Sequence, residues 1–170
     1  GLHMPVFFYD PFLDSGTTAE HGATQVDDPV ELASMVDILS IHSPLTDLNK
    51  YLVNRDVLQA MKPGAILINA SRGPLVDEAA LIEALQSGHL GGAGLDVYDP
   101  EPPAPDNPLF QMDNVALTPH LASFTDEGRQ RMGLMAVEDT LRVLRGEQPL
   151  HLANPGVRTG ITNKGEGEGE

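Results

Sequence analysis

The sequence predicts an α/β domain built on a parallel sheet, and two observations lead to that prediction. First, five short apolar runs recur along the chain: "PVFFY" at 5–9, "DILSI" at 37–41, "AILIN" at 65–69, "GAGLDV" at 92–97 and "NVALT" at 114–118. Nearly continuous apolar runs of this length are typical of strands buried on both faces of a parallel sheet. Second, helix-like stretches lie between these runs, as parallel strand–helix–strand units require.

Each helix-like stretch begins at a residue that can cap a helix N-terminus. The four caps are Asp28, which precedes Pro29, and Asn54, Asp77 and Thr125. The last of these helices carries apolar residues at spacings of three and four, namely Leu134, Val137, Leu141 and Leu144, so one of its faces should be apolar. Gly88 and Gly146 are placed to end the third and fourth helices.

Composition excludes several classes of protein. The chain has 170 residues, of which 41% are hydrophobic, and its net charge is −15. This acidic balance argues against binding to nucleic acid and to anionic membranes, both of which favour basic surfaces. Cysteine is absent, which excludes disulfides and thiolate chemistry. No apolar run approaches the ~20 residues of a membrane span, so we expect a soluble, cytoplasmic protein.

Two segments fall outside the strand–helix pattern. The proline-rich segment "DPEPPAPDNP" at 99–108 should form an extended loop, and the acidic, glycine-rich end "GITNKGEGEGE" at 160–170 should be disordered. We therefore expect one partial domain over 1–150 and a tail over 151–170.

Polar residues follow each predicted strand, where ligands bind in open parallel sheets. In chain order they are Asp10, Ser43, Ser71, Arg72, Asp96 (within the run 92–97), Glu101 and His120, and the apolar Pro44 and Ala70 lie beside them. Loops are polar in any fold, so one such residue alone carries little weight. Their coincidence at one edge of the sheet favours a functional site.

The types of residue at this edge indicate a chemistry. Arg72 carries a permanent charge and a planar fork of donors that matches a carboxylate. His120 can give or take a proton near neutral pH, and Glu101 could orient its imidazole. This set suits a small 2-keto or 2-hydroxy acid. Asp10 suggests the source of a hydride, because an acidic residue after the second strand of a dinucleotide-binding unit accepts hydrogen bonds from the ribose of NAD.

Four segments resemble those of the D-isomer-specific 2-hydroxyacid dehydrogenases, a family that includes D-lactate, glycerate and phosphoglycerate dehydrogenases. They are "HSPLT" at 42–46, "LINASRGPLVDEAALIEAL" at 67–85, "GAGLDVYDPEPP" at 92–103 and "NVALTPHLAS" at 114–123. The resemblance covers about residues 1–150. It implies a Rossmann-like sheet, NAD as the cofactor and a homodimer that acts on small 2-keto or 2-hydroxy acids.

The resemblance also implies roles for individual residues. The catalytic set is Arg72, Glu101 and His120, with His120 as the proton donor in keto-acid reduction and Glu101 as its partner. The cofactor site is lined by Asp10, Ser43, Pro44, Ala70, Ser71, Arg72, Asp96, His120 and Ala122. Asp96 is expected to meet the nicotinamide carboxamide, and the residues after His120 to border the same ring.

Other interpretations stay open. Asp96 could satisfy a turn, and Glu101 could be a solvated loop residue. Ser71 lacks the glycine-flanked elbow of a hydrolase nucleophile, and the scattered histidines lack metal-ligand spacing, so we expect no metal. At the level of function, the alternatives are an NAD-sensing binding protein like the C-terminal-binding-protein corepressors, which resemble this family, and an inactive interaction fragment.

One feature of the family is missing. The dinucleotide-binding fold needs a G-x-G-x-x-G turn about 20 residues before the acidic residue, and none precedes Asp10. We therefore expect an incomplete Rossmann-like sheet without its first strand and its glycine-rich turn. That strand is normally central, so its absence should expose two strand edges. The remaining strands could then pair in a new order, or a second copy could fill the gap.

Overall fold

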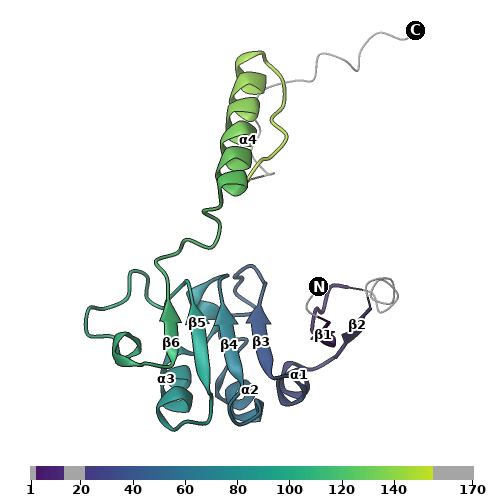
Figure 1. Ribbon diagram of the computed structural model, residues 1–170. Coiled ribbons are helices and arrows are strands. Elements are labelled where there is room, and N and C mark those ends of the chain that lie inside the picture. Colours follow the sequence, from purple (N-terminus) through teal and green to yellow (C-terminus); the bar gives the residue numbers. More distant parts are fainter. Residues whose placement is uncertain (1–2, 14–21, 155–170) are drawn as a thin grey trace. The chain divides into compact units, whose positions relative to one another are not determined.

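The computed structural model describes residues 3–13 and 22–154. The chain forms two compact units, Gly1–Leu121 and Ala122–Glu170. The first unit holds the predicted α/β architecture, and Figure 1 shows its strands and helices in alternation. Most of the predicted tail, residues 155–170, lies outside the described residues.

A four-stranded parallel sheet is the centre of the first unit. Its strands are β3 (Ile38–Ile41), β4 (Ile66–Asn69), β5 (Gly92–Leu95) and β6 (Val115–Leu117), in the spatial order β3-β4-β5-β6. All neighbouring pairs run parallel, as predicted. The four predicted runs from residue 37 onward thus became strands, each shortened by one or two residues at its ends.

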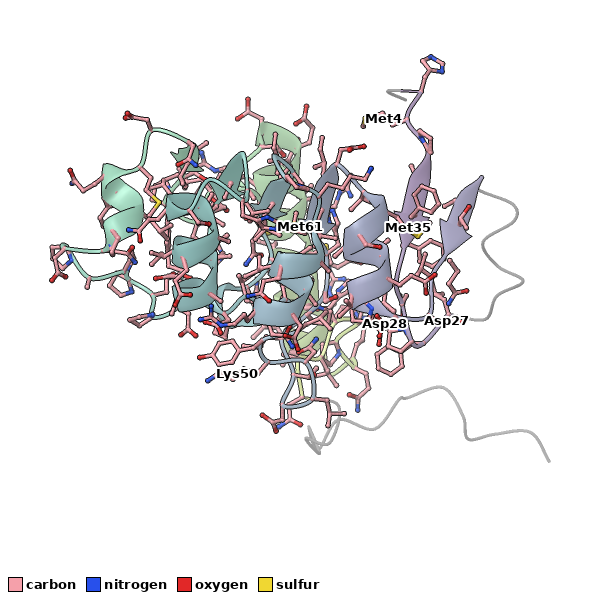
Figure 2. The ribbon with its side chains drawn as sticks, turned by 90° about the horizontal axis from the view of Figure 1, so that it is seen from below. Met4, Asp27, Asp28, Met35, Lys50 and Met61 are labelled. Carbon is pink, nitrogen blue, oxygen red and sulfur yellow. The ribbon has the colours of Figure 1, made fainter. Side chains whose placement is uncertain are left out.

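Three helices lie next to one another; the first precedes β3, the second connects β3 to β4 and the third connects β4 to β5. They are α1 (Pro29–Met35), α2 (Arg55–Ala60) and α3 (Glu78–Gln86). The predicted N-caps of these helices are confirmed. The side chains of Asp28, Asn54 and Asp77 each accept hydrogen bonds from backbone N–H groups of the first turn. Figure 2 labels Asp28 at the start of α1. Gly88, with φ of 74°, follows α3 as predicted.

The hydrophobic core lies between the helices and one face of the sheet. Leu67 of β4 and Leu58 of α2 are almost fully buried in it, as is Met61, labelled in Figure 2. The prediction that the strands are buried on both faces was wrong, because Ile66 and Ile68 of β4 are 41% and 37% exposed. The crossovers return on a single side, and no described helix of the first unit covers the other face.

The remaining strands of the first unit form a separate sheet. β1 (Val6–Phe8) was predicted, whereas β2 (Ala23–Gln25) was not, and the two pair in parallel. β1 and β3 do not pair with each other, so the described strands have not adopted a new order. A groove of about 720 Å³ lies between them and is lined mainly by residues 4–10 and 35–43. Figure 2 labels Met4 and Met35, which both line this groove.

The second unit is built around one long helix, α4 (Asp126–Leu144). Thr125 caps it, as predicted, by accepting a hydrogen bond from the Gly128 N–H at 3.0 Å. After Gly146 the chain turns back, and the Asp139 carboxylate accepts hydrogen bonds from the backbone N–H groups of Leu150 and His151. The predicted apolar face of this helix is exposed: Leu134, Val137, Leu141 and Leu144 are each at least 44% accessible.

None of the described helices is long and apolar enough to cross a membrane.

Candidate active site

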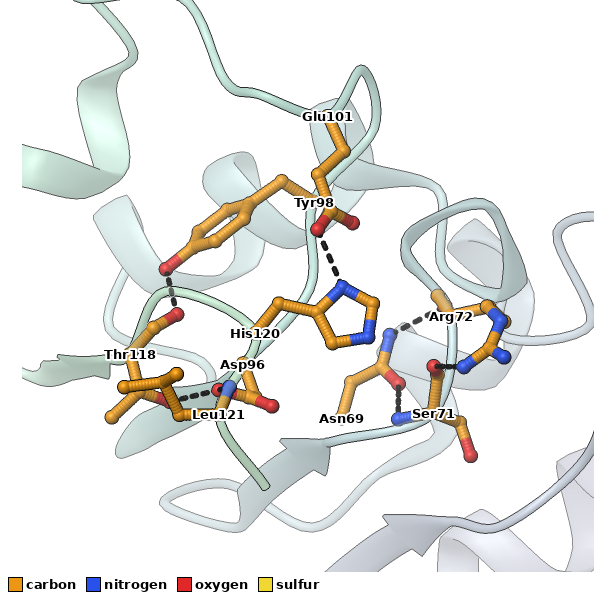
Figure 3. Close-up of polar contacts among 9 residues, drawn as sticks. All are labelled: Asn69, Ser71, Arg72, Asp96, Tyr98, Glu101, Thr118, His120 and Leu121. Atoms are coloured by element: carbon orange, nitrogen blue, oxygen red, sulfur yellow. Dashed lines mark hydrogen bonds and ion pairs between the residues drawn. The ribbon is translucent and has the colours of Figure 1, made fainter. Parts of the chain in front are cut away.

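The register of the sheet brings three loops to one edge. Asn69 pairs with Leu95, and Leu95 pairs with Leu117, so β4, β5 and β6 end at the same level. The loops that follow carry Arg72, Glu101 and His120 respectively. Figure 3 shows all three side chains at this edge. The topology therefore gathers the three residues that the sequence analysis predicted as the catalytic set.

His120 and Glu101 form an ion pair when the imidazole is protonated. Nδ1 of His120 lies 2.6 Å from Oε1 of Glu101, within hydrogen-bond range. The two side chains are 46% and 37% exposed, so the pair is accessible to a ligand. Because Nδ1 faces the carboxylate, the other ring nitrogen, Nε2, is the one left to exchange a proton with a substrate.

The turn that carries His120 is fixed from both sides. His120 has φ of 57°, a left-handed conformation that is unfavourable for a residue with a side chain. Oδ1 of buried Asp96 accepts hydrogen bonds from the Thr118 hydroxyl and from the Leu121 N–H, the latter at 2.7 Å. These partners bracket His120 in the chain. Asp96, predicted to meet the nicotinamide, thus also stabilises the histidine turn.

Tyr98 supports the same turn. Its hydroxyl donates to the Thr118 carbonyl at 2.9 Å, and its side chain is 6% exposed. Burial raises the pKa of Tyr98, and the negative charges of Asp96 and Glu101 raise it further. The phenol therefore stays neutral at physiological pH and keeps its proton for this hydrogen bond.

Asn69 shapes the loop that presents Arg72. This buried side chain donates from Nδ2 to the Arg72 carbonyl at 2.9 Å and accepts from the Ser71 N–H at 3.1 Å. The exposed Arg72 guanidinium donates to the Ser71 carbonyl at 2.6 Å. Gly73 is required next, because a Cβ there would lie 1.7 Å from the Tyr98 carbonyl oxygen. The loops after β4 and β5 are therefore in close backbone contact.

The predicted cofactor residues fall into three groups. Ala70, Ser71, Arg72, Asp96 and His120 lie at the edge formed by β4, β5 and β6, with the Ser71 hydroxyl donating to the Ile41 carbonyl at the end of β3. Asp10 and Ser43 line the groove between β1 and β3, and Pro44 follows Ser43. Ala122 is the first residue of the second unit, so its predicted place stays a prediction.

Asp10 lines the groove, where its carboxylate can accept hydrogen bonds from a ligand. It is half-buried, and its Oδ1 accepts a hydrogen bond from the Phe12 N–H at 2.9 Å, while its backbone carbonyl accepts one from the Gln25 side chain. A carboxylate in this place fits the ribose hydroxyls of a dinucleotide. Among the described residues there is no group of three or more His, Cys, Asp or Glu that could hold a metal ion.

Five residues that shape the site were not predicted. They are Asn69, Glu78, Tyr98, Asn107 and Thr118. An Asn at the end of an apolar strand is a known local signal for a side-chain turn, so Asn69 could have been found. The others act through partners 20 or more residues away, which no local pattern indicates.

The fold is that of a dinucleotide-binding α/β domain, and the carboxyl edge of its sheet carries a hydrogen-bonded histidine–glutamate pair and an arginine. Residues 1–122 match the family model "D-isomer specific 2-hydroxyacid dehydrogenase, NAD binding domain". The chain belongs to this family, and NAD is the cofactor of such a domain.

Individual relatives agree with this assignment. The D-3-phosphoglycerate dehydrogenase of Archaeoglobus fulgidus is 42% identical over 145 residues, which make up 85% of this chain and 27% of the relative. The glyoxylate reductase of Thermofilum pendens is 50% identical over 121 residues, or 71% of this chain and 36% of the relative. Among solved structures, the TT0316 protein from Thermus thermophilus superposes with a TM-score of 0.80 at 42% identity, over 89% of this chain and 46% of that one.

The chain thus spans less than half the length of these relatives.

Proposed function

We propose that this chain belongs to the cofactor domain of an NAD-dependent dehydrogenase that interconverts small 2-keto acids and D-2-hydroxy acids. The observation that carries the proposal is the 2.6 Å contact between His120 and Glu101, with Arg72 on the neighbouring loop. A general acid, its orienting carboxylate and a carboxylate-binding arginine are what the reduction of a 2-keto acid requires.

In the direction of reduction, Arg72 binds the substrate carboxylate through its two-pronged guanidinium and polarises the adjacent carbonyl group. Glu101 accepts the hydrogen bond of Nδ1–H and stabilises the protonated imidazole. His120 then gives the Nε2 proton to the carbonyl oxygen, which becomes the hydroxyl of the product. NADH, when bound, supplies the hydride that reduces the carbonyl carbon. In the reverse direction, the neutral imidazole removes the hydroxyl proton.

The residues that would hold NAD lie along the carboxyl edge. Asp10 would accept hydrogen bonds from the ribose hydroxyls, and Ser43, Pro44, Ala70 and Ser71 would line the path between the groove and the catalytic residues. Asp96 and Ala122 would border the nicotinamide. A homodimer and a cytoplasmic location remain parts of this proposal.

A panel of 2-keto acids tests the proposal in the full-length protein. NADH oxidation is followed with glyoxylate, hydroxypyruvate, pyruvate and larger 2-keto acids, with the His120→Asn variant as a control. We expect turnover of at least one substrate and a large loss in the variant. NADH binding without turnover of any member would favour the corepressor-like alternative, and the absence of both would favour an inactive interaction fragment.

A further inference from the structure

Glu78, in the first turn of α3, binds both ends of the loop that carries Glu101. Its Oε2 accepts a hydrogen bond from the Asp99 N–H at 3.2 Å, and its Oε1 accepts one from Nδ2 of Asn107 at 2.7 Å. Asp99 and Asn107 stand on either side of Glu101 in the chain. One carboxylate therefore closes the base of the loop 99–107.

The two ends of this loop are themselves anchored. Asn107 is 8% exposed, and its Oδ1 accepts a hydrogen bond from the Leu109 N–H at 2.9 Å, which caps the short helix η3 (Pro108–Gln111). The Asp99 carboxylate accepts a hydrogen bond from the Tyr51 hydroxyl at 3.2 Å. Glu78 is thus the residue that connects two fixed points across the open part of the loop.

Glu101 sits on the exposed part of this loop and has no other support in the hydrogen bonds of the described residues than its contact with His120. Its position depends on how the loop is closed. The hydrogen bonds of Glu78 lead to Asp99 and Asn107, the two ends of the loop that carries Glu101, rather than to His120.

We propose that Glu78 is a positioning residue for the acid–base pair, because it closes the 99–107 loop and so holds Glu101 against His120. This inference rests on the proposed function. It also gives a role to the glutamate of the segment "INASRGPLVDEAAL", which carries Arg72 as well. One short segment would then place the substrate-binding arginine and, through Glu78, the partner of the catalytic histidine.

A double-mutant cycle in the full-length protein tests this role. Glu78→Ala, Glu101→Gln and the double variant are compared in keto-acid reduction across a range of pH. If Glu78 acts through Glu101, we expect Glu78→Ala to lower kcat about tenfold and to change KM for NADH by less than about twofold. In the Glu101→Gln background it should cause almost no further loss. Additive losses in kcat would overturn the proposal.

The pH profile gives a second readout. The charged groups around His120 are Glu101 and Asp96 on the β5 side and Arg72 on the loop after β4. Reduction needs the protonated imidazole, and Glu101 is its hydrogen-bond partner, so losing this contact should change the pH dependence of the rate. Glu78→Ala should reproduce the change seen in Glu101→Gln. A change in rate without a change in the profile would contradict the proposal.

Two measures separate this role from a general loss of structure. Glu31→Ala also removes a glutamate from the first turn of a helix, here α1, and should leave kcat and the profile unchanged. If Glu78→Ala does not fold, Glu78→Gln retains one acceptor oxygen and is measured in its place. Nitrogen NMR of the His120 ring reports its contact with Glu101 without turnover, and unchanged ring shifts in the Glu78 variant would overturn the proposal even if no substrate is found.

Discussion

His120 adopts a left-handed backbone conformation, which costs a residue with a side chain on the order of 1–3 kcal/mol. Hydrogen bonds from neighbouring residues offset this strain. The Asp96 carboxylate binds the residues on both sides of His120, and Tyr98 binds the carbonyl of Thr118. The strained turn directs the imidazole toward Glu101. At the scale of single residues, hydrogen bonds on both sides of His120 hold the turn that places its imidazole against Glu101.

Arg72 should depend on its geometry and not only on its charge. In the full-length protein, Arg72→Lys keeps the positive charge but loses the two-pronged hydrogen bond to the substrate carboxylate. We expect a cost of about 2–4 kcal/mol in the transition state, which is roughly 30- to 900-fold in kcat/KM, with little change in NADH affinity. Steady-state kinetics and a cofactor titration measure both quantities. A kcat/KM close to that of the unmodified protein would exclude the role of carboxylate anchor.

Asp10 should make the protein select NAD over NADP. Its carboxylate would repel a 2′-phosphate on the ribose, and Pro11 and Phe12 follow it in place of an arginine that could bind that phosphate. Fluorescence titration of the full-length protein with NADH and NADPH measures the two affinities. Asp10→Asn should reduce the difference between them. Tighter binding of NADPH would show that Asp10 has been assigned wrongly.

At the scale of elements, β5 and β6 are connected at their carboxyl ends by side chains from β5 and the residues that follow it. Of these side chains, Tyr98 can be followed most easily by experiment, because ionisation of its phenol changes the absorbance of the protein. Burial raises the pKa of its phenol above the ordinary value of 10.0. The folded state thus favours the neutral phenol, so its contribution to stability is complete below the pKa of the unfolded chain and is lost as pH rises toward that of the folded chain.

The titration of Tyr98 can be observed directly. Absorbance at 295 nm is followed against pH for the full-length protein and for Tyr98→Phe, and the difference isolates one tyrosine. We expect the missing component to titrate above the ordinary range. The variant should also lose the hydrogen bond to Thr118, at a cost of about 1–2 kcal/mol in the free energy of unfolding. A component that titrates at or below pH 10 would indicate that the phenol is not buried in solution.

Local signals explain why most elements could be predicted. Asp28, Asn54, Asp77 and Thr125 each cap the helix that follows, as the sequence predicts. β2 was missed because it has only three residues, "ATQ", without an apolar run. Exposure of Ile66 was missed because an apolar strand does not reveal how many of its faces are covered.

Some residues of the candidate site could also be predicted from local signals, and others could not. Arg72, Glu101 and His120 could be predicted because each follows a strand, and parallel strands place their ends at one edge. The contacts of Glu78 could not, since its partners lie 21 and 29 residues away and neither belongs to a recognisable pattern.

At the scale of the whole molecule, the first unit has apolar surfaces that its own described elements do not cover. Ile66 and Ile68 are exposed on one face of the larger sheet, and Val6 and Ile38 lie beside the groove between β1 and β3. Among the described strands, β1 and β3 each have an unpaired edge, whose backbone groups another strand could bind.

The chain by itself should therefore associate. Light scattering should give a mass above the 18.2 kDa of one chain. A mass of one chain at micromolar concentration would contradict this expectation.

His120, Glu101 and Arg72 are proposed to act together in reducing a 2-keto acid to the D-isomer of the 2-hydroxy acid. Chiral analysis of the product made by the full-length protein from NADH and its best 2-keto acid tests this proposal most directly. We predict one D-2-hydroxy acid formed for each NADH oxidised, and loss of both in His120→Asn. An L-product, or D-product formed at an undiminished rate by the variant, would contradict the account.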